Sequence, residues 1–261
     1  MFRLETVNEL SLRATCDDGQ GRLYTKAGAF IAGSGGFKFT KMLLGPGGNP
    51  VQALAGQILR RLTGENMPLM EVHPQGQSVT YYANLAQHVT VIDLQPGMSL
   101  NVESESLLAF NDACRYSARF YGQGMISQGG MFITKLTAIG HGAQVAVLSD
   151  GNPLVLPTPC RIDPDAIVCF TGSDPGFKLD VGFRNLIGQH SGESYQFDFT
   201  QPGGQVVLQP SERKSGLDIS IDGRNTGRGA DVQNNQSISG GVQNIGNAAS
   251  QIGNIVGGLF R

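Results

Sequence analysis

The sequence predicts an all-β protein, and three observations carry this prediction. The 261 residues include 37 Gly and 12 Pro but only 15% charged residues, which is typical of short strands and tight turns. Apolar and polar residues alternate over many short segments, as they do along half-buried strands. Similar strand-turn-strand patterns recur at nearly equal spacing, which predicts an internal repeat. We therefore expect a β domain over residues 1–215.

The clearest of these patterns lies at residues 193–212. Its aromatic side chains fall at every second position: Tyr195, Phe197 and Phe199. Residues 201–204 (Gln-Pro-Gly-Gly) then lead into a second apolar run at 206–208, which predicts a hairpin. Residues 69–82 and 132–147 follow the same pattern, with a predicted turn at Gly76 and at Gly140. The sequence thus predicts three tandem units.

The N-terminal residues 10–39 also alternate and turn. Residues 17–21 (Asp-Asp-Gly-Gln-Gly) separate two apolar alternations and predict another hairpin. In three places a polar turn precedes a small apolar run, as expected for a strand that crosses the core: 23–32, 100–110 and 160–170. Each predicted unit therefore has two halves.

One short helix interrupts the strands at residues 51–62. Its apolar residues follow helical spacing: Val51, Leu54, Ala55, Ile58, Leu59 and Leu62. Asn49 suits the N-cap, Pro50 the first turn, and Gly64 the end of the helix. The pair Arg60 and Arg61 lies in the last turn, where the helix dipole favours cations, so we expect solvated side chains there instead of a phosphate site.

The C-terminal residues 216–261 form a separate predicted region rich in Gly, Asn and Gln. This composition favours a flexible tail. Apolar residues nevertheless recur every three or four positions, which allows a weak helix that contacts a protein partner or a membrane surface: Val242, Ile245, Ala249, Ile252, Val256 and Leu259. The sequence shows neither a signal peptide nor an apolar run of membrane-spanning length, so we expect a cytoplasmic protein.

Residues that carry chemistry are scattered, so no catalytic, cofactor or metal site is predicted. The histidines occur singly: His73, His88, His141 and His190. The cysteines form no C-x-x-C pair, and free thiols are expected: Cys16, Cys114, Cys160 and Cys169. Residues 192–195 (Gly-Glu-Ser-Tyr) lack the pattern of a nucleophile elbow. The glycine-rich stretches 33–36 and 45–48 lack the phosphate-loop lysine and are interpreted as loops.

Several stretches together resemble the bacterial relatives of a fungal family, the altered-inheritance-of-mitochondria protein twenty-four family. They include Lys26-Ala-Gly-Ala-Phe-Ile-Ala, Gln95-Pro-Gly-Met, Leu107-Leu-Ala-Phe, Gly129-Gly-Met-Phe-Ile-Thr, Gly140-His-Gly, Gly192-Glu-Ser-Tyr and Pro202-Gly-Gly-Gln-Val-Val-Leu-Gln. The resemblance covers about residues 10–213. One turn differs, because residues 201–204 read Gln-Pro-Gly-Gly where the family has Gly-Pro-Gly.

The resemblance implies three consecutive units similar to the tryptophan-RNA-binding attenuation protein (TRAP), each a short double-stranded β-helix or β-sandwich. It also implies a homotrimer whose nine units form a ring. The family has no agreed enzymatic activity, so no catalytic residue follows from it. Unpaired outer edges of the first and third units would independently favour a head-to-tail contact between chains.

The residues and the family resemblance together leave two candidate functions. We expect a non-enzymatic assembly or scaffold protein, which contacts partners through its tail. The alternative is an RNA-binding ring, for which the basic candidates are Lys26, Lys38, Arg115, Arg119, Arg161 and Lys178. These residues do not repeat in register, and the net charge of −2 gives no general attraction to nucleic acid.

Overall fold

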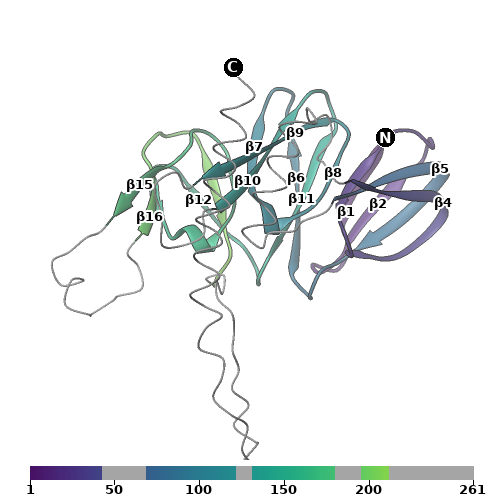
Figure 1. The fold of residues 1–261 in the computed structure, drawn as a ribbon, viewed down its shortest axis with the longest axis horizontal. Helices are drawn as coiled ribbons and strands as arrows, with labels where there is room; N and C mark the ends of the chain where they lie inside the picture. The colour runs from purple at the N-terminus through teal and green to yellow at the C-terminus, as the bar shows by residue number, and fades with distance from the viewer. Residues whose placement is uncertain (43–68, 122–130, 180–194, 212–261) are drawn as a thin grey trace, which may run out of the picture. The chain divides into compact units, whose positions relative to one another are not determined.

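The computed structural model describes residues 1–42, 69–121, 131–179 and 195–211. The chain divides into two units, Met1–Ser215 and Gly216–Arg261. The helix predicted at 51–62 and the tail predicted at 216–261 both lie outside the described residues. Within the described part almost every element is a strand, so the all-β prediction is confirmed (Figure 1).

The first sheet contains eight strands. Their order is β1-β2-β5-β3-β8-β11-β6, and β4 pairs with β5 outside this path. The strands are β1 (Phe2–Thr6), β2 (Leu12–Cys16), β3 (Leu23–Lys26), β4 (Phe30–Met42), β5 (Leu69–Tyr82), β6 (His88–Leu94), β8 (Leu107–Asn111) and β11 (Ala143–Ser149). All the pairings between them are antiparallel.

The second sheet contains six strands and the third contains three. The second runs in the order β12-β17-β14-β7-β10-β9, and the third in the order β13-β16-β15. The strands of the second are β7 (Ser99–Glu103), β9 (Cys114–Tyr121), β10 (Met131–Ala138), β12 (Leu154–Pro157), β14 (Ile167–Phe170) and β17 (Gln205–Leu208). Those of the third are β13 (Cys160–Ile162), β15 (Gly176–Leu179) and β16 (Tyr195–Phe199).

The first sheet curls around its own core. Along β2 the buried residues alternate with half-buried ones, and the buried set is Leu12, Ala14 and Cys16. The two ends of the sheet are joined by hydrogen bonds, because the Thr6 hydroxyl donates to the Val89 carbonyl at 3.2 Å and the Val89 amide donates to the Glu9 carbonyl at 2.7 Å. Curling therefore removes β1 and β6 as open edges.

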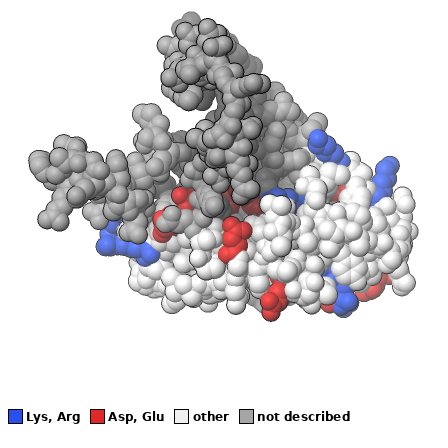
Figure 2. Space-filling view, turned by 90° about the horizontal axis from the view of Figure 1, so that it is seen from below, with Lys and Arg blue, Asp and Glu red and all other residues white. Residues whose placement is uncertain are grey.

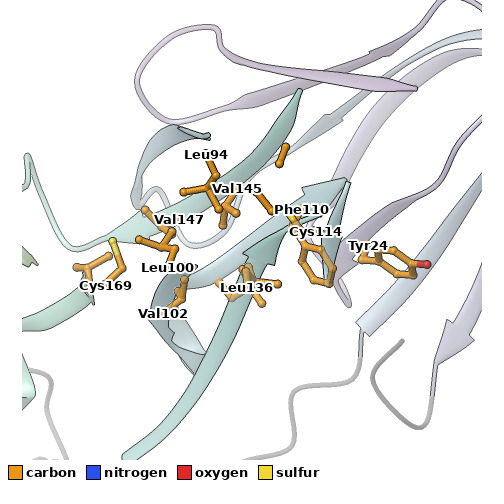
Figure 3. Close-up of a cluster of buried hydrophobic side chains, with 14 of the residues drawn as sticks. Tyr24, Leu94, Leu100, Val102, Phe110, Cys114, Leu136, Val145, Val147 and Cys169 are labelled. Carbon is orange, nitrogen blue, oxygen red and sulfur yellow. The ribbon is translucent and has the colours of Figure 1, made fainter. Parts of the chain in front are cut away.

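Strand β11 has a core on each of its faces. Val145 and Val147 belong to the cluster shared with the second sheet, whereas Ala146 and Leu148 belong to the cluster inside the first sheet. In the shared cluster, first-sheet residues such as Leu94 meet second-sheet residues such as Leu100 (Figure 3). Burial on both faces explains why this segment of the sequence is a continuous apolar run instead of an alternation.

The third cluster joins the second and third sheets. It contains the aromatic residues of the predicted hairpin, Phe197 and Phe199, together with Phe170 and Val206. The Phe170 and Phe199 rings pack edge to face with their centroids 5.1 Å apart. Alternation at residues 195–199 therefore correctly predicts one strand with a buried aromatic face.

The predicted hairpins at Gly140 and Gly203 are wrong in their pairing. Both turns exist, and Gly203 has the left-handed φ of 91° that favours glycine. However, β10 and β16 each continue into a strand of a different sheet, β11 and β17 respectively. Strand β10 already lies between β7 and β9, and β11 lies between β6 and β8, so neither has a free edge for the other. These turns are corners between sheets.

The turn predicted at Gly76 is also wrong, because β5 passes through this residue as one strand of 14 residues. Gly76 has φ 114° inside the strand, which absorbs an irregularity without ending the pairing with β4. The hairpin predicted at 17–21 fails for another reason, since β2 and β3 both pair with β5 and not with each other. Because β4 pairs with β5 along one side, β2 and β3 both lie on the other side of β5, one after the other, and the connection at 17–22 runs beside β5 near Gly76.

The predicted polar turns at 100–110 and 160–170 are confirmed and resemble each other. Strand β7 leads through a short 3-10 turn, η1 (Ser104–Ser106), into β8, and β13 leads through η2 (Pro164–Ala166) into β14. The carboxylates of Glu103 and Asp163 accept hydrogen bonds from amides of the two turns. The prediction of three TRAP-like units goes beyond this likeness and stays a prediction.

Candidate interaction surfaces

Large apolar side chains that stay exposed mark the candidate surfaces of this protein. Among the described residues they are Met1, Val7, Leu10, Phe30, Ile31, Leu85, Met98, Ile139, Leu154 and Val155. Single exposed apolar residues are normal, but neighbouring ones mark contact sites. The exposed set lies on loop tips of the first sheet, on two joined turns and on two strands.

One surface is formed by the loop tips at residues 7–11 and 84–87. Leu85 is 90% exposed, and it has a left-handed φ of 47°, as does Ala86 with φ 56°. The Gln87 amide donates to the Asn84 carbonyl at 2.9 Å, which closes a type I′ turn around them. Such a backbone costs a non-glycine residue about 1–2 kcal/mol. The described part contains one other such residue, Glu9, whose carbonyl binds Val89.

A second surface is strand β4. Phe30 is exposed, and its ring packs against those of Phe37, Phe39 and Tyr82 with centroid distances of 5.7, 5.0 and 5.9 Å. Gly33 leaves room for these rings, because an added Cβ would lie 2.7 Å from the Phe37 ring. One side of β4 pairs with β5 along its length, and no described strand pairs with its other side. Within the described part of the chain, this strand therefore presents an open sheet edge.

The position of β4 corrects two sequence predictions. The sequence predicts a loop at residues 33–36, but they belong to the strand. The run at 29–32 leaves the core after the buried Ala29, since Phe30 and Ile31 are 39% and 55% exposed. Only glycine fits at Gly35 and Gly36, where an added Cβ would lie 2.1 Å and 2.6 Å from the carbonyl oxygens of Gln77 and Gln75. The glycines thus serve close strand pairing.

The remaining exposed apolar residues lie on the second sheet and at its junction with the first. Leu154 and Val155 are 54% and 52% exposed on β12, which pairs with β17 alone among the described strands. Met98 and Ile139 lie in adjacent turns, held together because the Ala138 amide donates to the Met98 carbonyl at 2.9 Å. Strand β12 is therefore a second open edge with exposed apolar side chains.

The basic residues considered for RNA binding do not form one surface. Arg161 and Lys178 meet at one carboxylate, Asp198, at 3.7 Å and 2.5 Å. Arg119 pairs with Asp174 at 3.4 Å, and the Lys26 ammonium donates to the Glu105 carbonyl at 2.8 Å. Lys38 and Arg115 are exposed on two other strands. Figure 2 shows Lys and Arg in separate groups, with acidic residues and uncharged surface between them.

The histidines are likewise dispersed. His73 lies 3.4 Å from Glu71, which also pairs with Arg22, while His88 begins β6 and His141 lies in the turn after β10. Over residues 1–42, 69–121, 131–179 and 195–211, no group of three or more His, Cys, Asp or Glu side chains is arranged to hold a metal ion. His190, residues 45–48 and most of the 192–195 segment lie outside the described residues.

The four cysteines are free thiols with little access to reagents. Cys16, Cys114 and Cys169 are buried, and Cys160 is half-buried. Burial raises the pKa of the Cys114 and Cys169 thiols to about 12, and it also raises the pKa values of Cys16 and Cys160. A thiol with a raised pKa is a poor nucleophile at neutral pH. These cysteines therefore behave as packing residues.

No described helix is long and apolar enough to span a membrane. Sequence reasoning expects unpaired edges on the first and third units, but it does not identify β4 and β12 as the strands that form open edges in the described part. The available signal was the uncharged composition of residues 30–37 and 154–157.

Comparison with known proteins agrees with the all-β fold. The model of the family described as "Mitochondrial biogenesis AIM24" matches residues 5–211. A crystal structure of a protein from Streptococcus pyogenes superposes with a TM-score of 0.61 and 18% sequence identity, covering 81% of this chain and 94% of that one. The search of curated proteins gives no match.

The family match spans most of the β unit and includes all three sheets. Its description names no catalysed reaction. The structural similarity, at 18% identity, supports the fold alone. The chain belongs to the Mitochondrial biogenesis AIM24 family.

Proposed function

We propose that this protein is a non-enzymatic assembly or scaffold protein that acts in the cytoplasm as a head-to-tail homotrimer. The observation that carries the proposal is the placement of exposed apolar side chains on two strand edges, β4 and β12, that are open in the described part of the β unit. Open edges recruit further strands unless something covers them. The closure number of three comes from the family resemblance, and the free thiols suit a reducing compartment.

The polar side chains and thiols of the described residues support a role without catalysis. Polar side chains that could do chemistry are engaged in structural contacts, such as the buried Glu103 carboxylate, which accepts from the amides of Glu105 and Ser106 and from the Ser106 hydroxyl. The described thiols have raised pKa values instead of the lowered values of reactive cysteines. Among the described residues, the exposed apolar side chains at the β4 and β12 edges are the ones that this proposal assigns to function.

Sedimentation of the full chain tests this proposal. The expected species has about three times the 27.7 kDa chain mass at micromolar concentration. A chain that ends at Arg224 should give the same ratio, because the family match ends at residue 211. A monomer at every concentration would overturn the assembly proposal.

In this proposal the tail, residues 216–261, recruits a protein partner or a membrane surface. The apolar stripe from Val242 to Leu259 supports this role, since it becomes useful only when another surface covers it. Removing the tail should reduce co-sedimentation with liposomes or reduce the set of co-purifying proteins. If neither changes, the tail has no such role.

RNA binding is the competing function, and the same purified chain can distinguish the two. Single-strand binding needs unpaired cations beside stacking surfaces, whereas Arg161, Lys178 and Arg119 already contact carboxylates. We expect no submicromolar retention of mixed-sequence RNA at low salt in a filter-binding assay. Retention that weakens as salt rises would favour the RNA-binding ring instead.

A further inference from the structure

We propose that the contact between copies is a β-strand pairing between the first half of β4 in one chain and β12 in the next. This inference rests on the proposed assembly and specifies its interface. The open edges that the described residues present differ in how well they are protected against pairing.

Most of these edges carry a device that discourages pairing. The two ends of the first sheet, β1 and β6, are joined by the hydrogen bonds of Val89. The outer strands β9, β13 and β15 carry Arg119, Arg161 and Lys178, whose charges oppose the approach of another strand. These edges are therefore protected.

Two open edges in the described part lack this protection. Strand β4 carries Lys38 and Lys41 in its second half, but its first half, residues 30–37, has no charged residue. Strand β12 (Leu-Val-Leu-Pro) has none at all. Both segments expose apolar side chains, Phe30 and Ile31 on β4 and Leu154 and Val155 on β12. Over the described residues, each chain therefore offers one unprotected edge on the first sheet and one on the second.

The two edges also match in length. Register irregularities bracket the first half of β4 at Phe30/Ala32 and at Gly35/Phe37. Between them four residues stay in register with β5, 32–35 (Ala-Gly-Ser-Gly), the last of which has a left-handed φ of 84°. Strand β12 has four residues. Small side chains at 32–35 keep the β4 backbone accessible, whereas the side chains of β12 supply the apolar contact. A short pairing of this kind fits both partners.

A second copy of this chain is the occupant that the pairing identifies. The β4 and β12 edges are different surfaces, so their contact between copies is heterologous and propagates head to tail. Such a contact closes into a ring when the rotation permits, as the proposed trimer requires. The interface would be uncharged at its centre, which is typical of the buried part of oligomer contacts.

Charged substitutions at the two edges test the pairing in the full chain. Ser34→Lys and Val155→Glu each place a charge on an exposed edge position. Each should raise the dissociation constant of the assembly by about tenfold or more in sedimentation experiments, since a charge at a strand edge opposes pairing. Thr40→Lys, on the half of β4 that already carries lysines, is the matched control and should leave the assembly unchanged.

The double variant S34K/V155E tests directly whether the two edges pair with each other. If β4 of one chain pairs with β12 of the next, every interface then contains an opposite-charge pair, and the dissociation constant should return most of the way to the wild-type value. Circular dichroism melting of each variant confirms that the monomer remains folded.

The other outcomes separate this inference from the proposed function. A wild-type chain that never assembles overturns both. Assembly that resists the single substitutions overturns the β4–β12 pairing but leaves the scaffold proposal intact. Disruption by S34K alone, without effect of V155E and without rescue in the double variant, would show a β4 contact with a different surface and would also overturn the pairing.

Discussion

Single buried polar residues specify how the sheets connect, and Glu103 is the clearest case. Its carboxylate accepts three hydrogen bonds within η1, at 3.0, 3.0 and 3.1 Å, and the side chain is buried. Glu103→Ala should cost about 1–3 kcal/mol of unfolding free energy, because it leaves these donors without their acceptor in the interior. Urea denaturation measures the loss.

Asp163 provides the matched comparison. It occupies the same place before η2 but accepts from one amide, that of Asp165 at 2.8 Å, and it is only half-buried. Asp163→Ala should therefore cost less than Glu103→Ala, about 0.5–1 kcal/mol. Equal losses at both sites would show that burial does not decide the contribution of these caps.

Another prediction at this scale concerns acid stability. The hydrogen bond from Lys178 lowers the pKa of Asp198 below its ordinary value of 3.8. A carboxyl with a lowered pKa stabilises the fold above its unfolded pKa, and this contribution disappears as pH falls through the folded pKa. The Tm difference between wild type and Asp198→Asn should thus be constant near neutral pH and shrink below about pH 4.

Asp174→Asn is the control for this measurement. Its partner Arg119 lies 3.4 Å away, and both side chains are about half-exposed, so the pair should contribute little at any pH. A difference for Asp198→Asn that persists unchanged at pH 2 would contradict the assigned ion pair.

At the scale of elements, glycine conformation separates two effects in the β4 region. Gly28 and Gly35 share a φ of +84°, but an added Cβ meets no atom within 4 Å at Gly28 and lies 2.1 Å from the Gln77 carbonyl oxygen at Gly35. Gly28→Ala should cost about 1–2 kcal/mol from backbone strain alone. Gly35→Ala should cost clearly more, because β4 must also move away from β5.

Denaturant unfolding of the two glycine variants measures this difference. Similar values would mean that the β4–β5 pairing yields locally at no cost.

The type I′ turn at 84–87 offers a change in the opposite direction, since Ala86→Gly relieves a left-handed alanine. This variant should gain about 1 kcal/mol, whereas Ala118→Gly in β9 should lose stability as glycine does in a strand.

The sequence alone predicts where the strands lie better than it predicts how they pair. Alternation predicts individual strands well, because the pattern in residues 12–16 or 195–199 directly reflects one buried face. Pairing is not local, so the turn at Gly203 looks like a hairpin although its strands lie in different sheets. The end-to-end arrangement of β2 and β3 along one side of β5 likewise has no signal near residues 17–21.

The same limit applies to the candidate surfaces. Residues 29–37 are small, apolar and glycine-rich, which suits either a core strand or a loop when read alone. Their exposure follows from the position of β4 beside β5, on the side opposite to β2 and β3, and that position depends on residues far along the chain. Edges are properties of a completed sheet, so only the structure identifies them.

In the whole molecule, we expect the β4 and β12 edges, which are open in the described part of one chain, to be covered in the assembly. Hydrogen exchange of the full chain, followed by mass spectrometry, reads this directly because strand pairing protects backbone amides. Outward-facing amides at 32–35 and 154–156 should exchange slowly at assembly concentration and become fast on dilution below the dissociation constant. Equally fast exchange at both concentrations, in a sample whose mass shows the trimer, would contradict the proposed strand pairing.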